Sequence, residues 1–512
     1  MTDRTPPVLR PEHPMDRSLP GLVAEFGLEH SGTIDGVEVS GITVRASEVE
    51  PGDVFVGLPG VHVHGAQFAA DARERGAVAI LTDRAGAELA AESGLPAVIV
   101  DSPRAALGDV SAWIYQTLED PPLLFGITGT NGKTSTAYLL EAILRQLGLV
   151  AGLSSTAERH IGERLSVVSR LTTPEASELH ALLARMRESE VRAVAVEVSA
   201  QALSQNRIGG IVFDVVSFTN LSHDHLDDYA DMEEYFAAKL ALFEPEHGRR
   251  GVVSLDTEWG HRVVDRCRIP VTTIATVDGV DAEWRVEILD SRAEATTFRI
   301  TGPEGRTLET TIPLIGWHMA ANAGLAIVML VEAGFELEVI GHAVQDGIDV
   351  YLPGRTERIS GDYGPSLFVD YGHSPDAFVS TLDAVRAVTT GRIIMVFGAD
   401  GDRDTTKRLD MGRVASENSD IVIVTDYQPR SENPESIRRA LIEGTLLAEN
   451  QAELHEVAVP EQAIRLAVTL AREGDTILWA GPGHEDYREI DGVRIPYSAR
   501  AEARAALREA GW

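Results

Sequence analysis

Cysteine is almost absent from this sequence of 512 residues, which contains a single thiol, Cys267. One cysteine excludes an intrachain disulfide framework and a zinc or iron–sulfur site built from several thiolates. Long apolar runs are missing too: no stretch approaches the roughly 18 apolar residues that a membrane-spanning helix needs. The first residues are polar and rich in proline, so no signal peptide is predicted. We therefore expect a cytoplasmic protein without membrane insertion.

Basic residues are scarce. There are 45 Lys and Arg against 79 Asp and Glu, which gives a formal net charge of −34. A surface this acidic repels phosphodiester backbones and anionic lipids, so nucleic acid and membrane surfaces are poor candidate partners. Hydrophobic residues make up 44% and charged residues 24%, as in an ordinary globular protein. Any anionic ligand must then be bound by a local cluster of positive groups.

The length predicts about three domains. Short apolar runs alternate with helical patterns along the whole chain, which predicts α/β domains with wound, mainly parallel sheets. Prolines mark two linkers, one at 119–122 and one at 351–354. The predicted organisation is a flexible tail at 1–20, an N-terminal domain at 21–120, a central P-loop ATPase-like domain at 121–352 and a Rossmann-like C-terminal domain at 353–512.

The clearest motif is a glycine-rich loop at 126–135, between an apolar run and a helical pattern. Glycines let backbone N–H groups surround phosphate oxygens, and a helix N-terminus favours negative charge. Lys133 can then neutralise the β- and γ-phosphates, and Thr134 can reach Mg²⁺. The alternative is a glycine-rich turn with an incidental lysine. We predict ATP binding by Gly129, Thr130, Asn131, Gly132, Lys133, Thr134 and Ser135.

Ionisable residues follow two predicted strands near this loop. Glu197 ends the run 193–197, and the segment 220–229, which contains His225, follows the next strand. A carboxylate at the carboxyl end of a strand is well placed for Mg²⁺, whereas an acidic loop alone is more often a solvated cap. Lys239 lies among apolar residues on a predicted helix, where a bare ammonium is costly to bury. The alternative for Lys239 is a surface lysine with a buried stem.

The motif Thr-Gly-Thr-Asn-Gly-Lys-Thr at 128–134, followed by Asn-Leu-Ser-His-Asp-His-Leu-Asp at 220–227, resembles the Mur ligase family. The resemblance covers about residues 40 to 500. It implies an ATP-dependent carboxylate–amine ligase that works through an acyl phosphate, with Mg²⁺ and a carbamylated Lys239. It assigns Lys133, Glu197, His225 and Lys239 to catalysis, and it assigns metal binding to Thr134, Glu197, His225 and Lys239 as its carbamate.

Within the family the chain is most similar to the ligases that add the third amino acid in cytoplasmic peptidoglycan precursor synthesis. That likeness implies UDP-sugar binding by the N-terminal domain and ATP contacts from Asn322, Arg355 and Asp370. It implies binding of UDP-N-acetylmuramoyl-L-alanyl-D-glutamate by Thr172, Thr173, Ser199, Gln205 and Arg207. It places the incoming amino acid at Arg403, Tyr427, Gln428, Pro429, Arg430, Gly481 and Glu485. The C-terminal domain must then close onto the central one about the linker near 351–355, and we expect a monomer.

The segment Tyr427-Gln428-Pro429-Arg430 departs from the Asp-Asn-Pro-Arg of relatives that add meso-diaminopimelate. The retained Arg430 favours a substrate with a distal carboxylate, and hence meso-diaminopimelate, because a guanidinium repels an ammonium. The changed neighbours leave lysine, ornithine or a shorter diamino acid open. Two alternatives to the whole interpretation remain: a sibling ligase, including a folylpolyglutamate-type enzyme, and a nucleotide-binding regulator without turnover.

Overall fold

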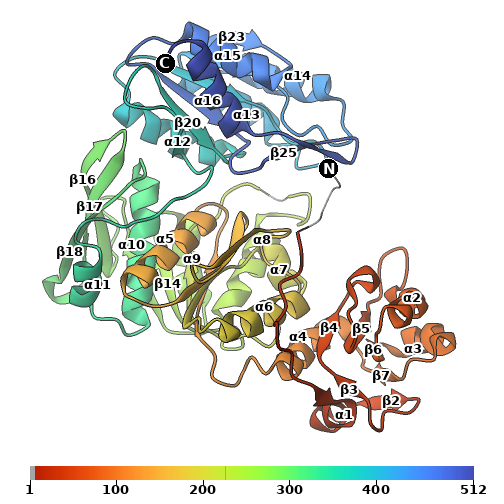
Figure 1. The fold of residues 1–512 in the computed structure, drawn as a ribbon. Helices are drawn as coiled ribbons and strands as arrows, with labels where there is room; N and C mark the ends of the chain where they lie inside the picture. The colour runs from red at the N-terminus through yellow and green to blue at the C-terminus, as the bar shows by residue number, and fades with distance from the viewer. Residues whose placement is uncertain (1–5, 225) are drawn as a thin grey trace.

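In the computed structural model, which describes residues 6–224 and 226–512, the chain folds around three separate sheets that are flanked by helices. Figure 1 shows them in chain order, with the N-terminal sheet in red and orange at one end, the large central sheet in the middle and the C-terminal sheet in blue at the other end. The predicted α/β class with mainly parallel sheets is confirmed. Within the described residues no helix combines the length and apolar character needed to cross a bilayer.

The N-terminal sheet has five strands in the order β2-β7-β6-β5-β4, all parallel except the β2–β7 pair. Helix α4 packs against α6 of the central domain, where the two domains share one apolar core. The elements are β1 (Arg17–Ser18), α1 (Leu19–Phe26), β2 (Glu29–Ser31), β3 (Glu38–Val39), β4 (Gly41–Thr43), β5 (Asp53–Gly57), α2 (Ala69–Glu74), β6 (Ala79–Thr82), α3 (Arg84–Ala90), β7 (Ala97–Ile99) and α4 (Pro103–Tyr115).

The flexible tail predicted at 1–20 is wrong for its last residues. Residues 17 and 18 pair with β3, and α1 begins at Leu19, which is fully buried. Pro20 lies in the first turn of this helix, where its missing N–H has no helical partner to lose. Upstream, Arg10 donates to Asp53 Oδ1 at 2.7 Å. The prolines among residues 1–20 therefore did not indicate where regular secondary structure begins.

The central sheet has eleven strands in the order β11-β10-β9-β12-β8-β13-β14-β15-β16-β17-β18. Strands β9, β12, β8, β13, β14, β15 and β16 run parallel, and antiparallel hairpins extend both edges. The strands are β8 (Leu123–Thr128), β9 (Ala151–Ser154), β10 (Glu158–Ile161), β11 (Leu165–Val168), β12 (Ala193–Glu197), β13 (Phe213–Phe218), β14 (Gly248–Ser254), β15 (Val271–Ala275), β16 (Trp284–Arg292), β17 (Ala295–Thr301) and β18 (Thr307–Ile312).

Helices cover both faces of this sheet, so its inner strands are buried on both sides and consist of nearly continuous apolar runs. Helices α5 and α10 pack together on one face, where they share a core. The helices are α5 (Lys133–Gln146), α6 (Ala176–Glu188), α7 (Ala200–Ser204), α8 (Met232–Leu240), α9 (Glu258–Arg266), α10 (Trp317–Glu332) and α11 (Leu337–Ala343).

The C-terminal sheet has six strands in the order β19-β20-β24-β21-β22-β23, parallel except for β19. Its loops at the carboxyl ends of β20, β21, β22 and β24 gather at one edge. The elements are β19 (Glu357–Arg358), β20 (Ser366–Asp370), α12 (Pro375–Val388), β21 (Ile393–Phe397), α13 (Arg408–Asn418), β22 (Ile421–Val424), α14 (Pro434–Thr445), β23 (Glu453–Glu456), α15 (Pro460–Leu470), β24 (Thr476–Ala480), β25 (Tyr487–Ile490), β26 (Val493–Pro496) and α16 (Ala499–Glu509).

Candidate active site

The glycine-rich loop lies between the carboxyl end of β8 and the first residue of α5. Gly129 and Gly132 have φ angles of +146° and +87°, which side chains rarely adopt. A Cβ on Gly129 would lie 1.8 Å from Thr219 Oγ1, and one on Gly132 would lie 2.6 Å from the Asn322 amide oxygen on α10. Glycine is therefore required here, and the loop opens at a helix N-terminus that favours anions.

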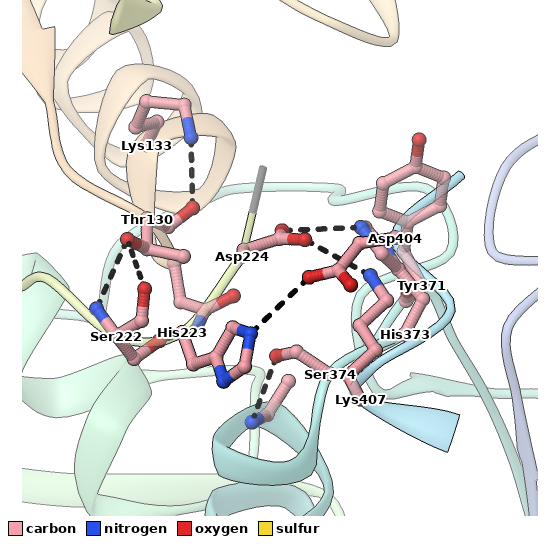
Figure 2. Close-up of polar contacts among 12 residues, drawn as sticks. Thr130, Lys133, Ser222, His223, Asp224, Tyr371, His373, Ser374, Asp404 and Lys407 are labelled. Carbon is pink, nitrogen blue, oxygen red and sulfur yellow. Dashed lines mark hydrogen bonds and ion pairs between the residues drawn. The ribbon is translucent and has the colours of Figure 1, made fainter. Parts of the chain in front are cut away.

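The segment after β13 holds this loop in place. Asn220 accepts from the backbone N–H of Thr130 at 2.9 Å through its carbonyl and from that of Asn131 at 3.0 Å through its side chain. Lys133 Nζ folds back and donates to the carbonyls of Gly129 and Thr130, at 3.0 and 2.8 Å; the second contact is drawn in Figure 2. Burial lowers the pKa of Lys133. These contacts fix the shape of the loop, and they place the Lys133 ammonium beside it.

Glu197 ends β12 beside this loop, in parallel register with Ile127 of β8, and its side chain is fully buried. Its carboxylate accepts from the backbone N–H and the hydroxyl of Thr156, both at 2.9 Å. The same hydroxyl lies 3.0 Å from Thr172 Oγ1. A buried carboxylate anchored in this way can present oxygen to a hard cation.

Lys239 on α8 also reaches this loop, with 1% of its surface exposed. Its Nζ donates to Gly129 O at 2.8 Å and lies 4.5 Å from the centre of the Tyr235 ring. Burial, and secondarily the charge of Lys133, hold the pKa of Lys239 well below its ordinary value. The alternative of an exposed lysine is wrong, because the helix places its nitrogen inside the site. His225 lies outside the described residues, and among those described no three His, Cys, Asp or Glu side chains form a metal-binding group.

Five predicted substrate residues gather around α7. Thr173 Oγ1 donates to the Glu197 carbonyl at 2.7 Å and accepts from the Ser199 N–H at 3.0 Å. Arg207 donates to Gln205 Oε1 at 2.7 Å and to Thr173 O at 3.4 Å. The guanidinium therefore lies beside Thr173, at the end of the strand that carries Glu197. Hydroxyl, amide and guanidinium donors suit carboxylate and pyrophosphate oxygens.

Arg355 connects the C-terminal domain to the phosphate loop. Its Nη2 donates to Thr134 Oγ1 at 3.2 Å, and its guanidinium carbon lies 4.1 Å from the centre of the Tyr371 ring. Asp370, predicted to contact the nucleotide, uses its carboxylate for hydrogen bonds within the domain. It accepts from the N–H groups of Thr356 and Gly372, both at 2.7 Å. It thereby fixes the linker after Arg355 to the end of β20.

The predicted amino-acid residues lie together on the loops after β22 and β24, apart from Arg403. Arg403 is on the loop after β21, is exposed, and has no hydrogen bond or ion pair to another described residue. Glu485 accepts hydrogen bonds from the Tyr427 hydroxyl and the Gln428 amide. Burial raises the pKa of Glu485 to about 7, against the lowering effect of Tyr427. Arg430 has a φ of +51° and donates its N–H to Glu489 O at 3.1 Å, so a strained backbone aims its side chain. Pro429 precedes it, and Gly481 lies against Tyr427.

A set of contacts that sequence reasoning missed joins the central and C-terminal domains next to the site. Lys407 Nζ forms an ion pair with Asp224 at 2.9 Å, and both side chains are 9% exposed. His223 Nε2 lies 3.2 Å from Asp404. Figure 2 shows the Asp224 carboxylate in contact with both Lys407 and His373. The sequence shows that both segments are charged, but only the fold reveals which of these charges pair with one another.

Comparisons with known proteins agree along the chain. Family models described as "Mur ligase family, catalytic domain", "Mur ligase middle domain" and "Mur ligase, glutamate ligase domain" match residues 38–115, 127–330 and 354–483. A UDP-N-acetylmuramyl-tripeptide synthetase of Leifsonia xyli is 61% identical over 100% of both chains. This chain belongs to the Mur ligase family. It is an ATP-dependent amide ligase of peptidoglycan synthesis, which removes the alternative of a regulator without turnover.

Other relatives of this Mur ligase carry names that specify other ligases or a particular amino acid. A UDP-N-acetylmuramoyl-L-alanyl-D-glutamate–2,6-diaminopimelate ligase of Streptomyces avermitilis is 41% identical over 99% of both chains. A solved structure with that ligase name is 25% identical, with a TM-score of 0.66, and covers 97% of this chain and 100% of its own. A MurF ligase from Thermotoga maritima, solved with ADP, has a TM-score of 0.61 at 16% identity and supports the fold alone.

Proposed function

We propose that this Mur ligase joins a third amino acid, a diamino acid, to UDP-N-acetylmuramoyl-L-alanyl-D-glutamate through an acyl phosphate. The observation that carries the proposal is the convergence on one loop. Lys133 and Lys239 both donate to Gly129 O, and Glu197 lies beside them. The names of the relatives that match along the whole chain support the substrate.

A reaction sequence follows from this arrangement. An oxygen of the substrate carboxylate attacks the γ-phosphorus of ATP, the bond to the β-phosphate oxygen breaks, and ADP leaves. The α-amine of the amino acid then attacks the acyl carbon, loses a proton, and displaces phosphate to leave the amide. Lys133 and the N–H groups of the loop stabilise charge on the phosphoryl oxygens, and Arg355 approaches the same place from the other domain. Arg207, Gln205 and the two threonines position the peptide carboxylate.

The residues around the loop fit a magnesium site. Glu197 is a buried carboxylate, Thr134 supplies a hydroxyl, and a carbamate on Lys239 would supply two oxygens. The buried Lys239 has a lowered pKa, and a neutral amine is the form that adds CO₂. Carbamylation of Lys239 also removes one of the two cations, Lys133 and Lys239, that donate to the Gly129 carbonyl. When bound, Mg²⁺ supplies charge neutralisation for phosphoryl transfer.

The remaining assignments rest on the same geometry. The N-terminal domain would bind the UDP part of the substrate. Its helix α4 packs on α6, and α6 begins three residues after Thr173, one of the predicted substrate-binding residues. ATP contacts would come from residues 129–135, Asn322 and Arg355. We also infer a monomer, because the phosphate loop and the loops that face it belong to one chain. ATP as substrate supports a cytoplasmic location.

The direct test supplies purified protein with ATP, the UDP-dipeptide and a mixture of diamino acids, and follows phosphate release and product mass. The proposal predicts a UDP-tripeptide and stoichiometric phosphate only when all three substrates are present. Phosphate release with a folate and glutamate, but none with the UDP-dipeptide, would contradict it and favour the folylpolyglutamate-type alternative. A Lys133→Ala variant is the control for phosphate released by contaminants.

A further inference from the structure

Asp400 lies in the amino-acid pocket and was not among the residues that the sequence indicated. It follows β21, on a loop that packs directly against the loop carrying Arg430. A Cβ on Gly401 would lie 2.0 Å from Pro429 O, and the Gly401 N–H donates to Gln428 O at 2.8 Å. The two loops are therefore in backbone contact. This packing brings the Asp400 carboxylate to the Arg430 guanidinium.

The contact between these two charges is incomplete. Asp400 Oδ1 lies 4.0 Å from Arg430 Nη2, which is an ion pair but too long for a hydrogen bond. Asp400 Oδ1 is buried, and so is Arg430 Nε; neither has a hydrogen-bond partner among the described residues. A buried carboxylate oxygen left without a donor is costly, so its presence points to a ligand that donates.

A second carboxylate lies near Asp400 in this pocket. Glu485 lies near Asp400, with Tyr427 and Gln428 bonded to it. Arg403 is exposed and close to Asp402, which accepts from Ser431. The carboxylates near Arg430 are thus Asp400 and Glu485, and Arg355 also lies near Glu485.

We propose that Asp400 is a specificity-determining residue that neutralises Arg430 and selects a diamino acid whose side chain ends in an ammonium group and carries no distal carboxylate. A terminal ammonium can donate to Asp400 and Glu485 together. A carboxylate on the same terminal carbon would face Asp400 when it approached Arg430, and that repulsion disfavours meso-diaminopimelate. The preference for meso-diaminopimelate that Arg430 alone predicts is thereby reversed. This inference rests on the proposed function.

The test measures kcat/KM for amide formation with L-lysine, L-ornithine, L-2,4-diaminobutyrate, meso-diaminopimelate and L-norleucine, with ATP and the UDP-dipeptide held saturating. We expect one of the first three to be preferred over both others by about tenfold or more. In Asp400→Asn the advantage over meso-diaminopimelate should shrink by about tenfold, mainly through the KM of the cationic amino acid. Asp410→Asn, which removes an exposed carboxylate on α13, should keep the wild-type ratio.

A wild-type preference for meso-diaminopimelate, equal use of L-norleucine, or an unchanged ratio in Asp400→Asn would overturn the inference. Each of these results still requires ligation to the UDP-dipeptide; the first and the third leave the proposed function standing, whereas equal use of L-norleucine would also contradict its diamino acid. Failure of ligation with every amino acid would contradict the proposed function instead. An Asp400→Glu variant keeps the charge and should retain the preference for the cationic amino acid, which a purely structural role of the aspartate would not predict.

Discussion

The ion pair between Lys407 and Asp224 is expected to hold the C-terminal domain in its working position. Both side chains are 9% exposed, and their nitrogen and oxygen are 2.9 Å apart. Removal of one partner of a buried pair costs roughly 3–5 kcal/mol. His373, 3.7 Å from the other carboxylate oxygen, remains as a second partner, so the lower end of this range applies. Lys407→Met keeps the apolar stem and removes the charge.

A loss of about 3 kcal/mol corresponds to about a hundredfold smaller equilibrium constant between the closed and open arrangements. We therefore expect kcat/KM for ligation to fall about a hundredfold, while ADP affinity changes little because the phosphate loop belongs to the central domain. The matched control is Arg439→Gln, which breaks a pair that is 65% exposed on both sides and is worth at most about 1 kcal/mol. A change in kcat/KM below about twofold in Lys407→Met, with a normal melting curve, would refute the reasoning.

Two further predictions concern buried groups. If Lys239 is carbamylated, removal of CO₂ should abolish ligation and added bicarbonate should restore it. Native mass spectrometry should then detect the carbamate on the protein. Full ligation activity of protein without the carbamate would contradict this prediction. Burial lowers the pKa of His160, but hydrogen bonds to Glu141 and Glu158 outweigh it and raise the pKa to about 9. Because the folded pKa lies above the unfolded value, this stabilisation is complete below about pH 6.5 and is lost as the pH rises through 9. The free energy of unfolding should decline over that window, and His160→Gln should flatten the decline; parallel curves would argue against it.

Strands of the parallel sheets could be predicted from the sequence because burial on both faces makes them continuous apolar runs. The run at 123–128 forms β8 with those bounds, and 476–480 forms β24. The antiparallel extension formed by β16, β17 and β18 was not predicted. Its central strand, β17, alternates buried and partly exposed residues, so it lacks the continuous apolar signal.

The grouping of site residues could also be predicted where family motifs mark them, as for Lys133, Glu197 and Lys239. Contacts between domains could not, because local sequence does not determine which charged loops meet after folding. Lys407 and Asp224 are 183 residues apart, yet they form a buried pair. Asp400 was overlooked for the same reason, since its importance depends on Arg430, which the next loop brings beside it.

The most direct test of the central claim follows an oxygen atom. The UDP-dipeptide is prepared with oxygen-18 in its peptide carboxylates and ligated to the preferred amino acid with unlabelled ATP. If a carboxylate oxygen attacks the γ-phosphorus and the amine then displaces phosphate, each released phosphate carries one oxygen-18. Unlabelled phosphate, formed together with the amide product, would contradict the acyl-phosphate account.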